Sequence, residues 1–391
     1  MRIILYEMKK IWNIKLIIMI AVLSALYYYM FIDFNIKHFP NGHPVTEEVN
    51  FSIQMIEQFG LSMEEDEFSD FILSTREKLI TEAETYINDI PIFAEAKIYS
   101  YEDYEKIHEK SNQTELETNA LWALLGEECD FVRFKLEALN NIENTYYNYP
   151  EYVINNLIPE ATNEKELDRL MEIKESEEYR NIMSGWVYDN TVTYAIYLTI
   201  LTILAVLVLI SPLIVTDHTK NVHLLQYTTK LGRSIFKKQF IATMLSTLFL
   251  TTVFILIFGI IYSSNDTWIF WNSGLTSFLN LTFLLDITYG QYIIIYIVVL
   301  YMLCLSAAAL VFVLSRFSQN LITLIMKLIP LFAVFGAIIA GVLNGTFEPT
   351  NIIYDRTGIL GIEPIVCGLL LILGLAISLY FVRKETKIDI T

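Results

Sequence analysis

Six apolar stretches of 17 to 24 residues constrain this chain more than any other feature of its sequence. A bilayer core is about 30 Å thick, and a helix needs roughly 20 apolar residues to cross it. The two short stretches, the first and the last, extend into interfacial residues such as Ile11, Trp12 and Pro364, and Pro212 and Pro330 are tolerated where neighbouring groups satisfy the freed carbonyls. The sequence therefore predicts an all-α polytopic membrane protein whose six transmembrane helices cover residues 16–32, 192–215, 240–262, 292–314, 321–343 and 365–382.

Residues 33–190, between the first and second stretches, have a different composition. They contain 35 of the 44 acidic residues and 12 of the 27 basic ones, a net charge of −23, whereas the other 233 residues have a net charge of +6. Because 54% of the whole chain is hydrophobic and only 18% is charged, neither a soluble enzyme nor a disordered acidic protein describes it.

Helix signals recur throughout residues 33–190. Three pairs are spaced for reciprocal helix capping: Ser62 and Glu65, Thr114 and Glu117, Asn163 and Glu166. The densest acidic run, 64–67, suits a first helical turn that the helix dipole favours. Apolar residues at intervals near three or four predict one continuous buried stripe after Thr114: Leu116, Leu121, Leu124, Leu125, Phe131, Phe134 and Leu139. We therefore expect one large helical domain that is tethered to the membrane at both ends; its single cysteine, Cys129, cannot form a disulfide within it.

Basic residues predict the orientation, because short cytoplasmic loops are enriched in lysine and arginine. Outside residues 33–190, all bases except Arg356 would lie on one face of the membrane: Arg2, Lys9, Lys10, Lys15, Lys220, Lys230, Arg233, Lys237, Lys238, Arg316, Lys327, Arg383, Lys384 and Lys387. Arg356 would lie on the opposite face. Both termini are therefore predicted to be cytoplasmic and residues 33–190 extracellular, in a bacterial cytoplasmic membrane. The first stretch fits an uncleaved signal-anchor better than a cleaved signal peptide, because bulky residues at 27–31 follow it.

Three further features each have two interpretations. The acidic excess of residues 33–190 could attract cationic peptides, but a merely soluble surface is favoured. Four residues loosely suggest a metal site, but their irregular spacing disfavours zinc: His38, His43, Glu47 and Glu48. Residues 263–291 contain no base and many aromatic residues, which predicts a helix in the outer interface. Such a helix could anchor the protein or line an exit path for substrate, and the anchor is favoured.

Motifs for hydrolytic chemistry are missing from the sequence. No glycine is followed by lysine, so a Walker A loop is excluded, and G-x-S-x-G, H-E-x-x-H and C-x-x-C are absent. Lys327 is the one ionisable group predicted inside a membrane span, and snorkelling toward the headgroups explains it better than ion coupling does. The sequence thus predicts no enzyme, no metal site and no cofactor in this chain, and it disfavours an ion-coupled carrier.

The most informative segment is the predicted cytoplasmic loop after the second span, 217–238, with the sequence DHTKNVHLLQYTTKLGRSIFKK. Val222 and Leu225 suggest a short amphipathic helix, and Gly232 permits a sharp turn before Arg233. Such a helix could fit a groove of a cytosolic partner. A basic helix that only binds anionic lipid is the simpler interpretation.

This loop resembles that of the permease subunits of type-2 ABC transporters, especially the exporter-like class of low-GC Gram-positive bacteria. The family shows a glutamate, a glycine four residues later, a leucine-rich turn, Ser-Ser-Lys and then Gly-Arg or Gly-Lys. The corresponding residues here, in register and without gaps, are Asp217, Asn221, Leu225, Thr228, Thr229, Lys230, Gly232 and Arg233. The shorter acid and the asparagine depart from the pattern and leave the loop's shape open.

The resemblance implies a permease subunit that pairs with a second copy or a paralogue and with two cytosolic ABC ATPase subunits, which would hold the ATP-Mg. It implies a cytoplasmic connecting helix at 1–15, a transmembrane helix at 16–32, the external domain at 33–190, a five-helix region at 191–384 with a coupling loop at 216–238, and a tail at 385–391. Leu225 and Tyr227 would contact the ATPase groove, and Lys230 and Arg233 would pair with its acids or with lipid phosphate. The expected function is ATP-driven export of a peptide, an antimicrobial or another amphipathic or hydrophobic compound; the alternative is a membrane sensor or scaffold whose external domain binds a ligand and signals to a cytosolic partner.

Overall fold

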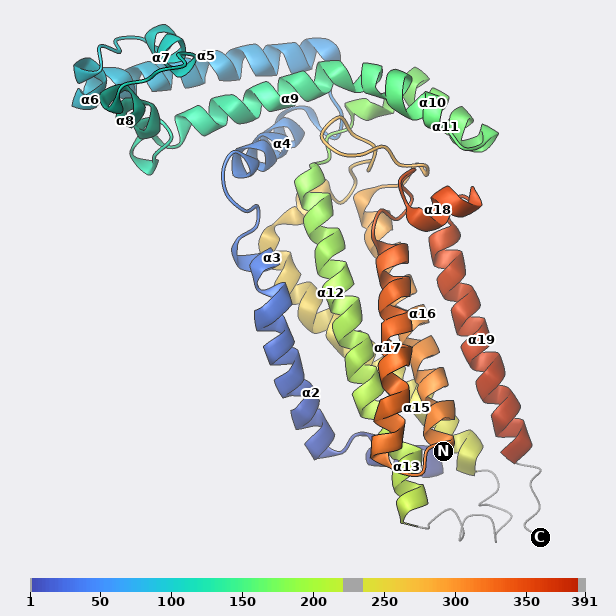
Figure 1. Ribbon diagram of the computed structural model, residues 1–391. Coiled ribbons are helices and arrows are strands. Elements are labelled where there is room, and N and C mark those ends of the chain that lie inside the picture. Colours follow the sequence, from blue (N-terminus) through green and yellow to red (C-terminus); the bar gives the residue numbers. More distant parts are fainter. Residues whose placement is uncertain (1, 221–234, 386–391) are drawn as a thin grey trace, which may run out of the picture.

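The computed structural model describes residues 2–220 and 235–385 as an all-α membrane protein (Figure 1). Six helical segments are long and apolar enough to cross a membrane. They are α2 (Ile14–Tyr27) with a π-helical turn (Tyr28–Ile32), α12 (Gly185–Ile210) with α13 (Pro212–Thr219), α15 (Ile235–Tyr262), α16 (Tyr289–Arg316), α17 (Leu321–Leu343) and α19 (Ile362–Glu385). The helical prediction is thereby confirmed, although α12 begins several residues earlier than its apolar stretch.

Helix α12 occupies the centre of the bundle (Figure 1). It packs against α2, α15, α16 and α17, and most of its residues are buried. Its sequence explains this position, because a helix that is apolar on every side must be surrounded by other helices or by lipid. Helices α2, α17 and α19 are buried over much less of their length, as expected for helices that face lipid.

A proline separates α12 from α13. Pro212 has no N–H, which frees the Val208 carbonyl four residues earlier. The Ser211 hydroxyl donates to that carbonyl at 3.4 Å, and Ser315 of α16 donates to the Ser211 carbonyl at 3.2 Å. Neighbouring hydroxyl groups therefore donate hydrogen bonds to backbone carbonyls at the break, as the sequence predicts for a tolerated proline.

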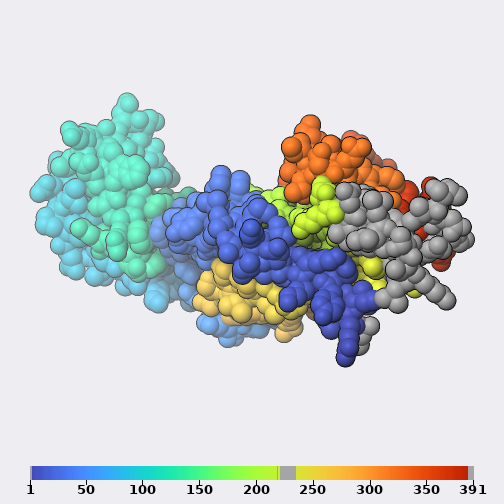
Figure 2. Space-filling view, turned by 90° about the horizontal axis from the view of Figure 1, so that it is seen from below, coloured from blue at the N-terminus to red at the C-terminus, as the bar shows by residue number. Residues whose placement is uncertain are grey.

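Both described ends of the chain lie at one end of the bundle, here called the termini end, and a helical domain covers the other, the domain end (Figure 1). The domain comprises α3 (Phe34–Lys37), α4 (Val45–Phe59), α5 (Glu65–Asp89), α6 (Pro91–Glu95), α7 (Tyr101–His108), α8 (Glu115–Ala123), α9 (Val132–Tyr152), α10 (Ile158–Glu160) and α11 (Glu164–Glu175). The antiparallel helices α5 and α9 pack together and extend beyond the bundle (Figure 2). Phe68 and Tyr146 stack between them with ring centroids 3.8 Å apart.

Of four local predictions in the domain, one is confirmed, one is confirmed in half, because Glu166 does not return the bond to the Asn163 N–H, and two are wrong. Thr114 and Glu117 form the predicted capping box, and Asn163 caps α11 by accepting from the Glu166 N–H at 3.0 Å. Helix α5 is capped by Glu64 and not by Ser62, because Glu64 and Glu67 satisfy each other's backbone N–H groups. The continuous stripe is also wrong, since the chain turns between α8 and α9, where Asp130 and Phe131 adopt positive φ.

The segment between α15 and α16 differs from its prediction as well. In place of an interfacial helix it forms two short 3₁₀ turns, Ser263–Asn265 and Thr267–Phe270, followed by an irregular loop. The reason is burial by protein: Phe270, Phe278 and Phe283 are each at most 1% exposed, and Phe278 belongs to the core of the helical domain. These aromatic residues thus join the domain to the bundle.

Candidate functional site

The candidate coupling site begins at Asp217, in the last turns of α13 at the termini end. The other residues assigned to it lie outside the described residues: Asn221, Leu225, Tyr227, Thr228, Thr229, Lys230, Gly232 and Arg233. Asp217 is therefore the point at which the candidate loop meets the described structure. The residue is only 8% exposed, which is unusual for an aspartate and indicates polar partners.

Those partners come from two other helices. The Lys10 amine of α1 (Arg2–Ile11) lies 3.2 Å from Asp217 Oδ2, and the Gln239 amide of α15 donates to the same oxygen at 2.8 Å. Gln239 and Lys10 also donate to Glu7 Oε2, each at 3.1 Å. Glu7, Lys10, Asp217 and Gln239 thus form a polar cluster, named here the clasp, which joins α1, α13 and α15.

Within the clasp, the carboxylates stabilise the charged form of the lysine. Burial by itself would lower the pKa of the Lys10 amine, but the carboxylates of Glu7 and Asp217 outweigh it and raise the pKa above its ordinary value. Lys10 is therefore charged at physiological pH and offsets part of the negative charge of Glu7 and Asp217. Because Gln239 donates to both carboxylates, moving α13 relative to α15 would separate a buried charge from its donor.

Helix α1 has a further attachment to α15 next to the clasp. The Trp12 indole donates to Ser246 Oγ at 3.1 Å, and its ring meets Phe249 edge-on at 5.2 Å between centroids. The segment predicted as an amphipathic connecting helix is thus held by charge at one turn and by an aromatic contact at the next. The sequence analysis did not identify Gln239 as a member of this site. The signal that could have indicated it is a polar amide at the start of an otherwise apolar span.

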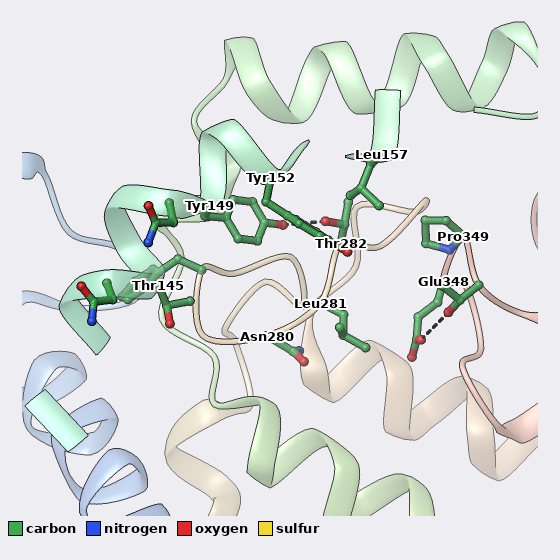
Figure 3. Close-up of a pocket in the computed structure, with 13 residues that line it drawn as sticks. Thr145, Tyr149, Tyr152, Leu157, Asn280, Leu281, Thr282, Glu348 and Pro349 are labelled. Carbon is green, nitrogen blue, oxygen red and sulfur yellow. Dashed lines mark hydrogen bonds between the residues drawn. The ribbon is translucent and has the colours of Figure 1, made fainter. Parts of the chain in front are cut away.

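A second candidate site lies at the domain end, where α9 meets the irregular loop (Figure 3). This space, the domain cavity, has a volume of about 390 Å³. Tyr149 bonds across it to Thr282 with 2.7 Å between the hydroxyl oxygens. The residues that line it are mainly aromatic, apolar or amide-bearing: Asn144, Thr145, Asn148, Tyr149, Tyr152, Leu157, Phe278, Asn280, Leu281, Thr282, Glu348, Pro349 and Thr350.

An adjoining space of about 580 Å³, the bundle cavity, lies between the domain-end parts of α12 and α17. Small residues of α17, Ala337, Ala340 and Gly341, leave room for it. The two cavities share the lining residues Leu281, Glu348 and Thr350. They therefore meet at Glu348, which follows α17 and is 7% exposed.

Glu348 is held in place by two hydroxyl groups. Tyr188 donates to its Oε1 at 3.1 Å and Thr350 to its Oε2 at 3.2 Å. Burial raises the pKa of this carboxyl, and the nearby acids Asp189 and Glu363 raise it further. Asp189 also lines the bundle cavity, and no lysine, arginine or histidine is among the described residues that line either cavity. Sequence reasoning missed Glu348, because a lone glutamate beside a span gives no distinguishing pattern.

The other residues weighed from the sequence have local partners. His43 Nδ1 lies 2.9 Å from Glu47 Oε1, and the imidazole stacks on Phe131 at 4.0 Å between centroids. Within residues 2–220 and 235–385, no three potential ligands are grouped so that they could hold a metal ion. The Lys327 amine donates to the Phe317 carbonyl at 2.8 Å, so it reaches the loop beyond α16.

Comparison with known proteins adds no relative: the chain matches no family model, no curated protein and no solved structure.

Proposed function

We propose that this chain is the membrane-spanning permease subunit of an ATP-driven exporter and that a separate cytosolic ATPase moves it. The observation that carries the proposal is the clasp. Asp217 lies at the start of the candidate coupling loop and is bonded to both α1 and α15. A partner that displaced the loop would therefore pull on three helices together.

The clasp suits a lever because its parts are not independent. Rigid elements joined by buried polar contacts transmit displacement, since separating them would leave charges unpaired. Helix α13 continues from α12 through the break at Ser211, and α12 packs against four other helices of the bundle. Movement at the loop would reach the centre of the bundle by this route and would open and close a membrane pathway by rigid-body motion.

A sensor or scaffold is the second candidate, favoured by the bonds that join the domain to the bundle. Tyr354 of α18 (Ile352–Thr357) donates to Glu166 Oε2 at 3.0 Å, and Asn163 donates to the Tyr354 hydroxyl at 3.1 Å. A ligand that bound the domain could alter the bundle through these contacts without being transported.

Site-directed cross-linking tests the permease proposal. The three cysteines of the chain are buried and should react little, so Lys230→Cys introduces a thiol for cross-linking into the candidate coupling loop. We expect a maleimide–succinimidyl cross-linker to join this position to an ATPase that copurifies with the chain, with a yield that changes when ATP binds. Arg356→Cys, at the domain end, is the matched control and should give no such product. Failure of any ATPase to copurify, together with no Lys230→Cys product, would contradict the proposal and favour the sensor.

A further inference from the structure

We propose that the junction of the domain and bundle cavities binds an amphipathic organic cation, with its ammonium group at Glu348 and its apolar body in the domain cavity. This inference rests on the proposed function, for which it names the class of substrate.

The charge at the junction identifies the head group. The buried Glu348 carboxylate has two hydroxyl donors but no cationic partner among the described residues that line the cavities, and Asp189 contributes a second acid. A carboxylate accepts up to about four hydrogen bonds, so Glu348 retains acceptor capacity. An ammonium group would supply both the donors and the compensating charge that a buried acid requires.

The domain cavity identifies the rest of the ligand. Tyr149, Tyr152 and Leu281 present aromatic and aliphatic surface to it (Figure 3). Its volume of about 390 Å³ lies within the range of small-molecule sites. Asn144 and Asn148 add amide groups to the lining. An apolar body that carries one or two donor groups fits these walls.

The position of the site supports a role in transport. The bundle cavity reaches from Glu348 down to Val192 of α12 and Ala337 of α17. Helix α12 continues at its far end into α13 and the clasp. A cation at Glu348 would thus contact the same helix that the candidate coupling loop moves.

Direct binding to the full chain in nanodiscs tests the site without any ATPase. The probe is 4-phenylbutylammonium, measured by titration calorimetry against empty nanodiscs, and 4-phenylbutanol is the neutral analogue. We expect saturable binding of the cation to the unmodified chain. The dissociation constant should be about tenfold higher for Glu348→Gln and for the neutral analogue, because each change removes one charged hydrogen bond. Glu166→Gln is the matched control, because this acid is also buried and accepts from a tyrosine hydroxyl but lines neither cavity. Its affinity should equal that of the unmodified chain.

A second variant guards against misfolding of Glu348→Gln. Asp189→Asn changes an exposed acid at the rim of the bundle cavity and should weaken cation binding about threefold. Equal affinity for the unmodified chain and both acid variants, or no saturable binding beyond empty nanodiscs, would overturn the site. If the unmodified chain shows no saturable binding while ATPase cross-linking is intact, only the site is rejected. If the unmodified chain binds the cation as expected but no ATPase is cross-linked, only the permease proposal is rejected.

Discussion

At the scale of single residues, packing at the domain end depends on close backbone approach. Gly290, in the first turn of α16, donates its N–H to the Trp271 carbonyl at 2.8 Å, and a Cβ at this position would lie 2.5 Å from Trp271 Cε2. The Trp271 ring packs against Trp268, with 5.2 Å between ring centroids, and its backbone is bonded to Gly290, so both would have to shift to admit a Cβ. A side chain is therefore excluded here for steric reasons, although the backbone conformation is ordinary.

Gly290→Ala should destabilise the protein by about 1–3 kcal/mol, the usual cost of overpacking. Gly259→Ala, in α15, is the control, since nothing lies within 4 Å of the place that its Cβ would occupy, and a helical alanine is neutral or stabilising. A thiol-reactive dye reports thermal unfolding of the full chain, because Cys129, Cys304 and Cys367 are buried in the fold. Equal midpoints for the two variants would contradict the packing account.

Glu348 gives cation binding a pH dependence. Burial raises its pKa above the ordinary value of about 4.5, assisted by Asp189 and Glu363, while the hydroxyls of Tyr188 and Thr350 oppose the shift. The ammonium ligand needs the deprotonated carboxylate, so affinity should fall as the pH is lowered through this raised pKa. Calorimetry from neutral toward acid pH should show that decline in the unmodified chain and a much flatter profile in Glu348→Gln. A decline of equal size in both proteins would show that another group titrates.

At the scale of elements, the clasp fixes α1 and α13 on α15 through a single amide. Replacing Gln239 by leucine would leave the carboxylates of Glu7 and Asp217 with one donor fewer in a buried setting. We expect Gln239→Leu to lower stability by about 1–3 kcal/mol. Lys237→Leu, on the exposed face two residues earlier in α15, is the control and should change stability by less than about 0.5 kcal/mol. The thiol-dye unfolding assay compares the two, and an equal shift for both would remove the special role of Gln239.

Elements with strong local signals were predictable from the sequence. The six spans follow from apolar length, and the caps at Thr114 and Asn163 follow from local hydrogen-bond chemistry. The turn between α8 and α9 was missed because the apolar spacing continues through it, while the left-handed residues Asp130 and Phe131 leave no composition signal. The aromatic loop was misread for a different reason. Its residues suit either lipid or protein surroundings, and only the tertiary fold places Phe278 in the domain core.

The candidate sites were predictable to an even smaller extent. Asp217 stood out through its place in a motif, but its partners Lys10 and Gln239 lie 207 and 22 residues away in the sequence. Glu348 meets Tyr188 across a separation of 160 residues. Pairings of this kind depend on how the helices pack, and one sequence without tertiary contacts does not contain them.

At the scale of the whole molecule, the charge distribution predicts an orientation. The segment 33–190 has a net charge of −23, and the described bases outside it lie at the termini end, with the exception of Arg356. We expect a membrane-impermeant maleimide to label Arg356→Cys in intact cells and to label Lys220→Cys only after the membrane is permeabilised. Both native positions are exposed, so access is limited by the membrane and not by folding. Labelling of Lys220→Cys in intact cells would reverse the orientation.

The most direct test of the central claim is ATP hydrolysis by the copurifying ATPase, measured with and without this chain in nanodiscs. We predict that the unmodified chain stimulates hydrolysis and that Arg233→Glu, which reverses a charge in the candidate coupling loop, returns the rate to near that of the ATPase alone at equal abundance in the membrane. Arg356→Glu, the same change at the domain end, should leave stimulation intact. Full stimulation by Arg233→Glu would contradict the assignment of this loop as the coupling element.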